Sequence, residues 1–158
     1  MLERDGEANI GLRELARAVG VSPAAPYRHF DSRAALLEAL AVTGFKRFTA
    51  AMDAIVADRP EDLRTAMGKT YVRFALDNAN LFRLMFSPQL RRENRPGLRM
   101  AADAAYDTLR HLAGDDRRHS IAVWSQVHGL AVLLLDGQVR LAPEEDVDAL
   151  LEAVLSAG

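Results

Sequence analysis

The 158-residue sequence contains no cysteine, which excludes a disulfide framework, thiolate zinc sites and cysteine nucleophiles. It also has no apolar run near the roughly 18 residues of a membrane span, and residues 1–10 include no secretory apolar region. We therefore expect a cytoplasmic protein that does not contact a membrane. Hydrophobic residues make up 49% and charged residues 27%, so the chain can form a packed core.

Familiar catalytic patterns are missing as well, including GxGxxG, the P-loop, GxSxG and HExxH. His111 and His119 flank Asp115 and Asp116, but the segment Gly-Asp-Asp-Arg-Arg is typical of a solvated turn. We expect no catalytic residue, no metal and no cofactor. A helical enzyme that uses scattered Asp and His stays open as an alternative, which turnover of a bound small molecule would reveal.

The charge balance is only weakly informative, because the net charge of −2 carries no basic signature of nucleic-acid binding. Residues 1–48 hold seven Lys or Arg against six Asp or Glu, a net +1, and the rest holds 13 against 16, a net −3. This asymmetry permits DNA binding through the N-terminal part.

Strand-type alternation is absent, and helical periodicity runs through nearly the whole chain. The fold class we predict is all-α, with a helix-turn-helix DNA-binding head over residues 1–47 and a helical ligand-binding and dimerisation body over residues 48–158. The punctuation by Gly, Pro, Asp and Ser predicts helices at 11–19, 23–29, 32–57, 60–78, 80–86, 96–113, 117–137 and 143–157.

Residues 11–30 have the pattern of a helix-turn-helix. Leu12, Leu15, Ala16 and Val19 follow the spacing of a one-faced helix, and Gly20 suits the end of that helix. Ser22 is a strong N-cap, and the next residue, a proline, fits the first helical position. Two short helices joined by a tight turn make this motif, which also occurs as a plain corner in other all-α proteins.

The second helix suits a DNA major groove, since small residues at its start allow close backbone approach. Hydrogen-bonding side chains fit phosphate oxygens, Arg28 reaches a base edge or a phosphate, and Arg33 lies where free N–H groups of the next helix favour an anion. The predicted DNA-binding residues are Ser22, Pro23, Ala24, Ala25, Tyr27, Arg28, His29 and Arg33.

The segment LRELARAVGVSPAAPYRHFDSRAALLEAL resembles the DNA-binding region of the tetracycline-repressor (TetR) family of bacterial regulators. The Tyr27–Phe30 block, then Arg33 and the Leu36-Leu37 pair, carry the resemblance. It implies phosphate contacts from Tyr27, His29 and Arg33, the last standing where the family usually has lysine. It further implies a ligand-responsive repressor that a small molecule releases from a palindromic double-stranded DNA operator.

The sequence departs from that family at its start, because only residues 1–6 precede the Glu7–Ile10 link. Family members have a full first helix there, which covers the face that bears Leu15, Val19, Phe30 and Leu37. Each buried side chain contributes about 1.5–3 kcal/mol. We expect either residues upstream of Met1 in the natural protein or a weakened head. The alternative function is a dimeric small-molecule-binding module with impaired or no DNA binding.

Aromatic residues and methionines gather in the second part of the chain. A mainly apolar pocket with a few polar groups would take a small, largely apolar ligand, although ordinary core packing explains the same pattern. The predicted pocket residues are Tyr71, Phe74, Met85, Phe86, Met100, Tyr106, Trp124 and His128. The stretches WSQVHG and NLFRLMFSP resemble a C-terminal subtype of the same family, and His128 is either a hydrogen-bonded core histidine or a ligand contact.

Residues 121–137 are apolar on almost every face, so we expect a helix there to be buried on every face. Together with the last helix they predict a four-helix bundle about a two-fold axis, and hence a homodimer. The alternative is a central helix in a monomer. The predicted interface residues are Val127, Leu130, Leu134, Leu151, Val154 and Leu155.

Overall fold

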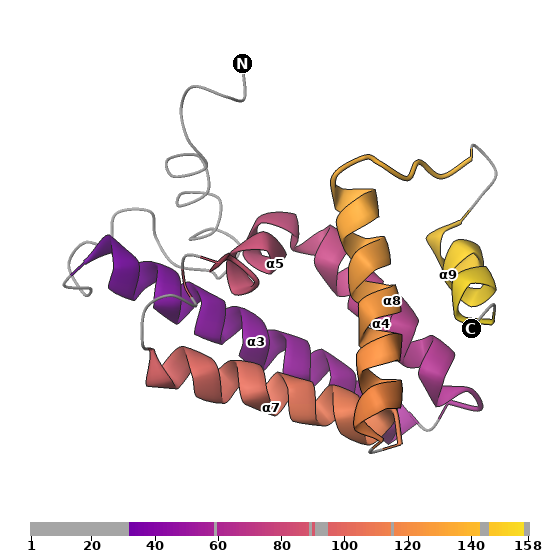
Figure 1. The fold of residues 1–158 in the computed structure, drawn as a ribbon, viewed down its shortest axis with the longest axis horizontal. Helices are drawn as coiled ribbons and strands as arrows, with labels where there is room; N and C mark the ends of the chain where they lie inside the picture. The colour runs from indigo at the N-terminus through magenta and orange to yellow at the C-terminus, as the bar shows by residue number, and fades with distance from the viewer. Residues whose placement is uncertain are drawn as a thin grey trace. The chain divides into compact units, whose positions relative to one another are not determined.

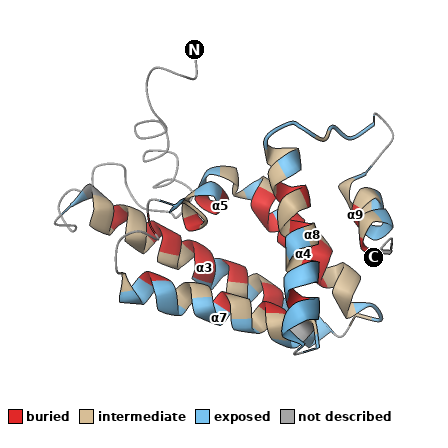
Figure 2. Ribbon diagram, viewed as in Figure 1, coloured by how far each residue is buried: buried red, intermediate tan, exposed pale blue. Residues whose placement is uncertain are grey.

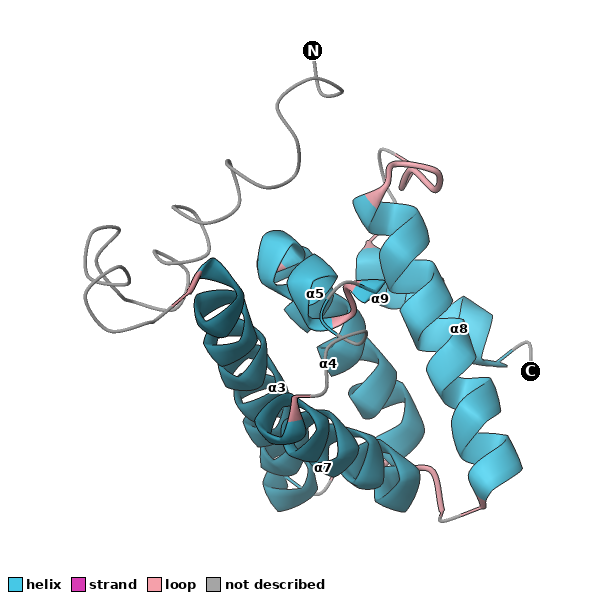
Figure 3. Cartoon of the chain, turned by 60° about the vertical axis from the view of Figure 1, so that its left-hand side comes forward, coloured by secondary structure: helices cyan, strands magenta, loops and turns pink. Residues whose placement is uncertain are grey.

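The computed structural model describes residues 32–58, 60–88, 90, 95–114, 116–142 and 146–156. Within these ranges every regular element is a helix and no strand occurs (Figures 1 and 3), which confirms the all-α class. The helices expected at 11–19 and 23–29, and with them the helix-turn-helix, lie outside the described residues. None of the described helices has the length and apolar character needed to cross a membrane.

The described helices agree closely with those expected from the sequence. They are α3 (Arg33–Asp58), α4 (Leu63–Asp77), α5 (Ala79–Met85), α7 (Pro96–Leu112), α8 (Arg117–Leu135) and α9 (Val147–Ser156). The largest differences are the starts of α4 and α9, which lie three and four residues later than the prolines taken as start signals.

Short-range caps explain where α4 and α8 begin. A carboxylate oxygen of Asp62 accepts a hydrogen bond from the Thr65 amide at 3.1 Å, so Asp62, and not the nearby proline, caps α4. Hydrogen bonds from the side chain and the backbone amide of Thr65 lower the pKa of Asp62. Asp116 caps α8 by accepting from the amides of Arg118 and His119, both at 3.2 Å.

The chain divides into two compact units, Met1–Lys46 with Asn78–Ala102 and Arg47–Asp77 with Asp103–Gly158. Helices α3 and α7 each contribute residues to both units. The sequence predicts two continuous domains divided at residue 47, whereas each compact unit combines two separate segments of the chain. The predicted domain boundary therefore stays a prediction.

The first unit packs the start of α3 against α5 and the start of α7 (Figure 2). A Cβ added at Gly44 would lie 2.8 Å from Cγ of Met85, so the glycine allows the two helices to approach closely. Phe45 meets Phe86 edge-on, with ring centroids 5.7 Å apart. The buried apolar residues of this unit include Leu36, Leu40, Ala41, Phe45, Leu81, Phe82, Met85, Leu90 and Leu98.

In the second unit α4 packs against both α8 and α9. Gly68 makes this possible, because a Cβ there would lie 2.5 Å from Cδ1 of Leu155. Leu151 is fully buried and Leu155 is 3% exposed, so the apolar stripe of α9 is covered by its own chain. Burying these side chains contributes about 1.5–3 kcal/mol each.

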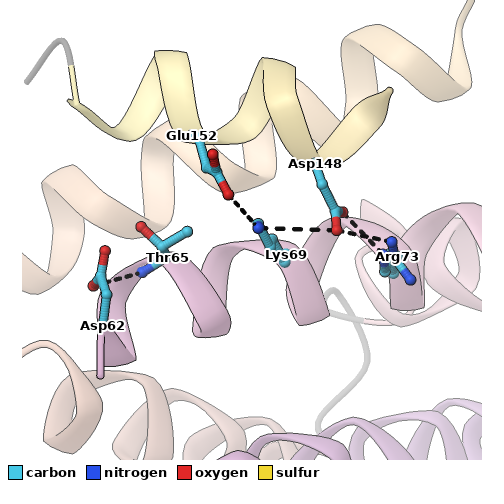
Figure 4. A network of polar contacts seen from close by, with 6 residues as sticks. All are labelled: Asp62, Thr65, Lys69, Arg73, Asp148 and Glu152. Carbon is cyan, nitrogen blue, oxygen red and sulfur yellow. Dashed lines mark hydrogen bonds and ion pairs between the residues drawn. The ribbon is translucent and has the colours of Figure 1, made fainter. Parts of the chain in front are cut away.

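A charged network follows the edge of the α4–α9 contact (Figure 4). Arg73 binds both carboxylate oxygens of Asp148, at 3.0 and 2.8 Å, and Lys69 pairs with Glu152 and lies 3.9 Å from Asp148. The hydrogen bond to Glu152 raises the pKa of Lys69, and the one to Asp148 raises the pKa of Arg73. The network orients α9 along α4, although exposed pairs contribute little stability.

Candidate functional site

Three polar-aromatic side chains meet between α4 and α8 in the second unit. Tyr71 on α4 is fully buried, and Trp124 and His128 on α8 are four residues apart and therefore share a face. The indole N–H of Trp124 donates to the Tyr71 hydroxyl at 3.0 Å, and that hydroxyl lies 2.8 Å from Nδ1 of His128. We call these three residues the Tyr71 cluster.

The donor and acceptor inventory fixes one of the two bonds in this cluster. An indole N–H only donates, so the Tyr71 oxygen accepts from Trp124. The direction of the bond between the Tyr71 hydroxyl and Nδ1 of His128 depends on the tautomer of the ring: the hydroxyl donates when the ring proton is on Nε2 and accepts when it is on Nδ1.

Burial raises the pKa of the Tyr71 phenol well above its ordinary value, and the hydrogen bond from Trp124 opposes this shift only in part. The phenol consequently stays protonated throughout the ordinary pH range. The same burial links the ionisation of Tyr71 to folding, because the unfolded chain releases this proton near pH 10 whereas the folded chain keeps it.

We therefore expect the free energy of unfolding to fall as the pH rises above about 10, because the unfolded chain then loses the Tyr71 proton whereas the folded chain keeps it. Tyrosinate absorbance and far-ultraviolet circular dichroism, followed together during alkaline titration, test this. One of the three tyrosines should ionise only as helix is lost, and Tyr71→Phe should remove that step. Free titration of all three with the helices intact would contradict the expectation.

Apolar rings surround the Tyr71 cluster. Phe48 of α3 packs edge-on against Tyr71 and Phe74, with centroids 5.1 and 5.3 Å apart, and Tyr106 of α7 lies 5.6 Å from Trp124. The structure thus brings together five predicted pocket residues, Tyr71, Phe74, Tyr106, Trp124 and His128. Sequence reasoning missed Phe48, although its spacing from Phe45, Met52 and Ile55 marks one buried face of α3.

Two family models match the chain. One, described as "Tetracyclin repressor-like, C-terminal domain", matches residues 64–157, which is more than half of the chain and includes the Tyr71 cluster. The other, described as "Bacterial regulatory proteins, tetR family", matches residues 1–40. The chain belongs to the TetR family. This confirms the resemblance inferred from the sequence.

Individual relatives extend the comparison. The nucleoid occlusion factor SlmA from two strains of Aliivibrio fischeri is 36% identical over 97 residues, which cover 60% of this chain and 50% of the relative. The TetR-family chain therefore spans about half the length of these curated relatives.

Two solved structures share the fold. A protein of unknown function from Rhodococcus sp. RHA1 is 31% identical with a TM-score of 0.74, over 99% of this chain and 86% of that chain. A chain described as a candidate regulatory protein, SCO4313, is 21% identical with a TM-score of 0.69, over 98% of this chain and 87% of that chain.

The other three predicted pocket residues belong to the first unit of this TetR-family chain. Met85 is 3% exposed beneath Gly44, and Phe86 is half-buried against Phe45 and Phe82. Met100 is 73% exposed on α7. The sequence could not separate these residues from the Tyr71 cluster, since the packing of helices that are distant in sequence decides which aromatic and methionine side chains meet.

The predicted interface residues divide by burial. Val127, Leu130, Leu151 and Leu155 are buried within the chain itself, at 0–7% exposure, whereas Leu134 and Val154 are half-buried. The buried four have little surface left to offer a partner. Large apolar exposure on α8 instead occurs at Ile121, 36%, and Leu133, 43%.

The predicted DNA-binding residues Ser22–His29 lie outside the described residues, and Arg33 enters only as the first residue of α3. Of the predicted turn carboxylates, Asp116 serves as a helix cap. The described part of the chain contains no group of three or more His, Asp or Glu side chains arranged to hold a metal ion.

Proposed function

We propose that this TetR-family chain is a transcription regulator that binds a roughly palindromic double-stranded DNA operator as a homodimer and is released from it by a small, largely apolar molecule. The observation that carries the proposal is the match of residues 1–40 to the family of bacterial regulatory proteins, in the region that contains the Ser22–Phe30 segment. Repression is the direction we expect, and catalysis is not expected.

In this proposal two recognition helices enter successive major grooves, about 34–36 Å apart. The ligand acts only through its difference in affinity between a conformation whose head spacing fits the operator and one whose spacing does not. Helix α3 supports such coupling, because it runs from Arg33 to Asp58 without interruption and contributes to both compact units.

The Tyr71 cluster supports a ligand site in the second unit. It combines apolar rings with a histidine that is bonded to Tyr71 through Nδ1 and is only half-buried. A ligand with one hydrogen-bonding group beside an apolar body suits such a lining.

DNA binding is tested on the full chain with the DNA upstream of its own coding region, by gel shift at two salt concentrations. We expect binding that weakens steeply with salt, since phosphate contacts dominate the affinity. The double variant Tyr27→Ala, Arg28→Ala should lose occupancy, and Arg110→Ala, remote in sequence from the head, serves as the matched control. Unchanged occupancy in the double variant would overturn the proposal and favour the alternative binding module.

The exposed face of α8 is our candidate for the dimer contact. Ala122 and Ser125 are exposed, and a Cβ added at Gly129 would meet no atom within 4 Å. Their spacing of three and four residues places them on one face, and small residues there allow two helices to approach closely. Ile121 and Leu133 add apolar area on either side of this stripe.

Replacing Gly129 by glutamate should convert the dimer into a monomer, because the new charge would be buried without a partner between two copies of α8. The open space around Gly129 means that the folded single chain should tolerate the change. Sedimentation equilibrium measures the result, with Ala104→Glu on the exposed face of α7 as the control. A Gly129→Glu protein that remains dimeric would place the interface elsewhere.

A further inference from the structure

Arg95 connects the beginnings of α7 and α3 within the first unit. Its Nη1 donates to Oε2 of Glu38 at 2.6 Å and to the carbonyl oxygen of Ala34 at 3.2 Å. The side chains of Arg95 and Glu38 are 11% and 26% exposed, so this charge-assisted pair is sheltered from water far more than an ordinary surface ion pair.

The backbone of Arg95 is itself held at the start of α7. Its carbonyl oxygen accepts from the Arg99 amide at 3.0 Å, and the following residue, Pro96, restricts the conformation of Arg95. Glu38 also lies against this helix start, with Oε1 3.8 Å from the position a Cβ would take at Gly97. The guanidinium therefore extends from a fixed base.

The other end of the contact is the first two turns of α3. Ser32 caps this helix by accepting from the Ala35 amide at 3.1 Å, and Arg95 binds the first turn at Ala34 and the second at Glu38. The same first turn begins with Arg33, three positions after Phe30, which ends the segment that our proposal inserts into DNA. Any tilt of this turn would move the attachment point of that segment.

We propose that Arg95 is a positioning residue for DNA binding, which acts by clamping the first two turns of α3 through Glu38 and the Ala34 carbonyl. The inference rests on the proposed DNA-binding function, and it assigns a role in that function to a residue 65 positions beyond Phe30 in the sequence. Arg95 itself makes no contact with DNA in this scheme.

The effect of charge on DNA affinity distinguishes positioning by Arg95 from a direct contact between Arg95 and DNA. Removing the carboxylate of Glu38 lowers the negative charge near the DNA-binding part, which by itself strengthens binding to a polyanion. Positioning predicts the opposite result, because the clamp is lost. If Arg95 bound a phosphate directly, replacing it would reduce the salt slope of the affinity by about one counterion.

The experiment uses the full chain and an oligonucleotide that the wild-type protein selects from a random duplex pool. Affinity is measured over a range of salt for Arg95→Met, Glu38→Ala and the charge swap Arg95→Glu, Glu38→Arg. Arg73→Met, which removes a more exposed arginine–carboxylate pair in the second unit, is the control for the loss of an arginine. Amide hydrogen exchange of residues 35–40 reports on the clamp without DNA.

We expect both single variants to bind about tenfold more weakly, the factor that follows from losing one charge-assisted hydrogen bond, with an unchanged salt slope. The charge swap should recover most of this loss. Exchange of residues 35–40 should accelerate in both single variants and stay as in the wild type for Arg73→Met.

Three outcomes would overturn the inference: Glu38→Ala binding as well as the wild type or better, a salt slope that falls in Arg95→Met, or unchanged exchange of residues 35–40 in a folded Arg95→Met protein. Selection of no duplex by the wild type would overturn the proposed function and, with it, the DNA-binding role of Arg95. The exchange measurement would still report whether the clamp itself exists.

Discussion

Replacing Leu151 by alanine is expected to lower the free energy of unfolding by about 2–5 kcal/mol, the range for truncating a buried leucine. Leu151 is fully buried where α9 packs against α4 and α8, and nearby Gly68 already lets Leu155 approach the α4 backbone. The contact is therefore too close to collapse around the lost methyl groups without moving a helix. Urea unfolding followed by circular dichroism measures the change.

The neighbouring leucine provides the control. Leu150 is only half-buried, so Leu150→Ala removes the same atoms at a much smaller cost, which we expect to be under half that of Leu151→Ala. Protein concentration distinguishes the two possible environments of Leu151. A loss that is independent of concentration fits packing within one chain, whereas a loss confined to dimer dissociation would contradict the packing described above.

Tyr71→Phe is expected to cost about 1–3 kcal/mol of folding stability, although it removes a single oxygen atom. That oxygen accepts from Trp124 and is hydrogen-bonded to Nδ1 of His128, so its loss deprives two part-buried polar groups of this partner. Phenylalanine keeps the ring against Phe48, which makes the hydroxyl the only difference. Thermal and urea unfolding give the magnitude.

Tyr106→Phe is the matched control for Tyr71→Phe, since it makes the same chemical change on a half-buried ring that lies tilted against Trp124. We expect it to change stability by much less. Nuclear magnetic resonance of the His128 ring shows which ring nitrogen carries the proton, and Tyr71→Phe should change its Nδ1 signal because the hydrogen bond at that nitrogen is lost. Equal stability of the two variants would show that the Tyr71 hydroxyl is not satisfied as described.

The helices were predictable because their signals are local. Pro96 at the first position of α7 and Asp116 before α8 set those starts to within one residue. The starts of α4 and α9 were predicted too early because proline only permits a helix to begin. α4 actually begins at Leu63, directly after Asp62, whose carboxylate accepts from the Thr65 amide.

The candidate site was only partly predictable. The pairing of Trp124 with His128 follows from helical spacing, but that Tyr71 joins them depends on how α4 crosses α8. The charged network was partly predictable. Lys69 and Arg73 are four residues apart, as are Asp148 and Glu152, so each pair lies on one face of its helix (Figure 4). The partner of Arg95 had no such signal, because 57 residues separate it from Glu38.

From the sequence alone follow the all-α class, most limits of the described helices and the TetR family, because periodicity, caps and a short motif are properties of neighbouring residues. Only the tertiary structure decided which apolar faces are covered by the chain itself. It buries Leu151 and Leu155 on α4 and leaves Ile121 and Leu133 exposed, a choice that depends on where Gly68 lets two helices approach. Periodicity shows that a face is apolar, whereas its partner is set by the packing of distant segments.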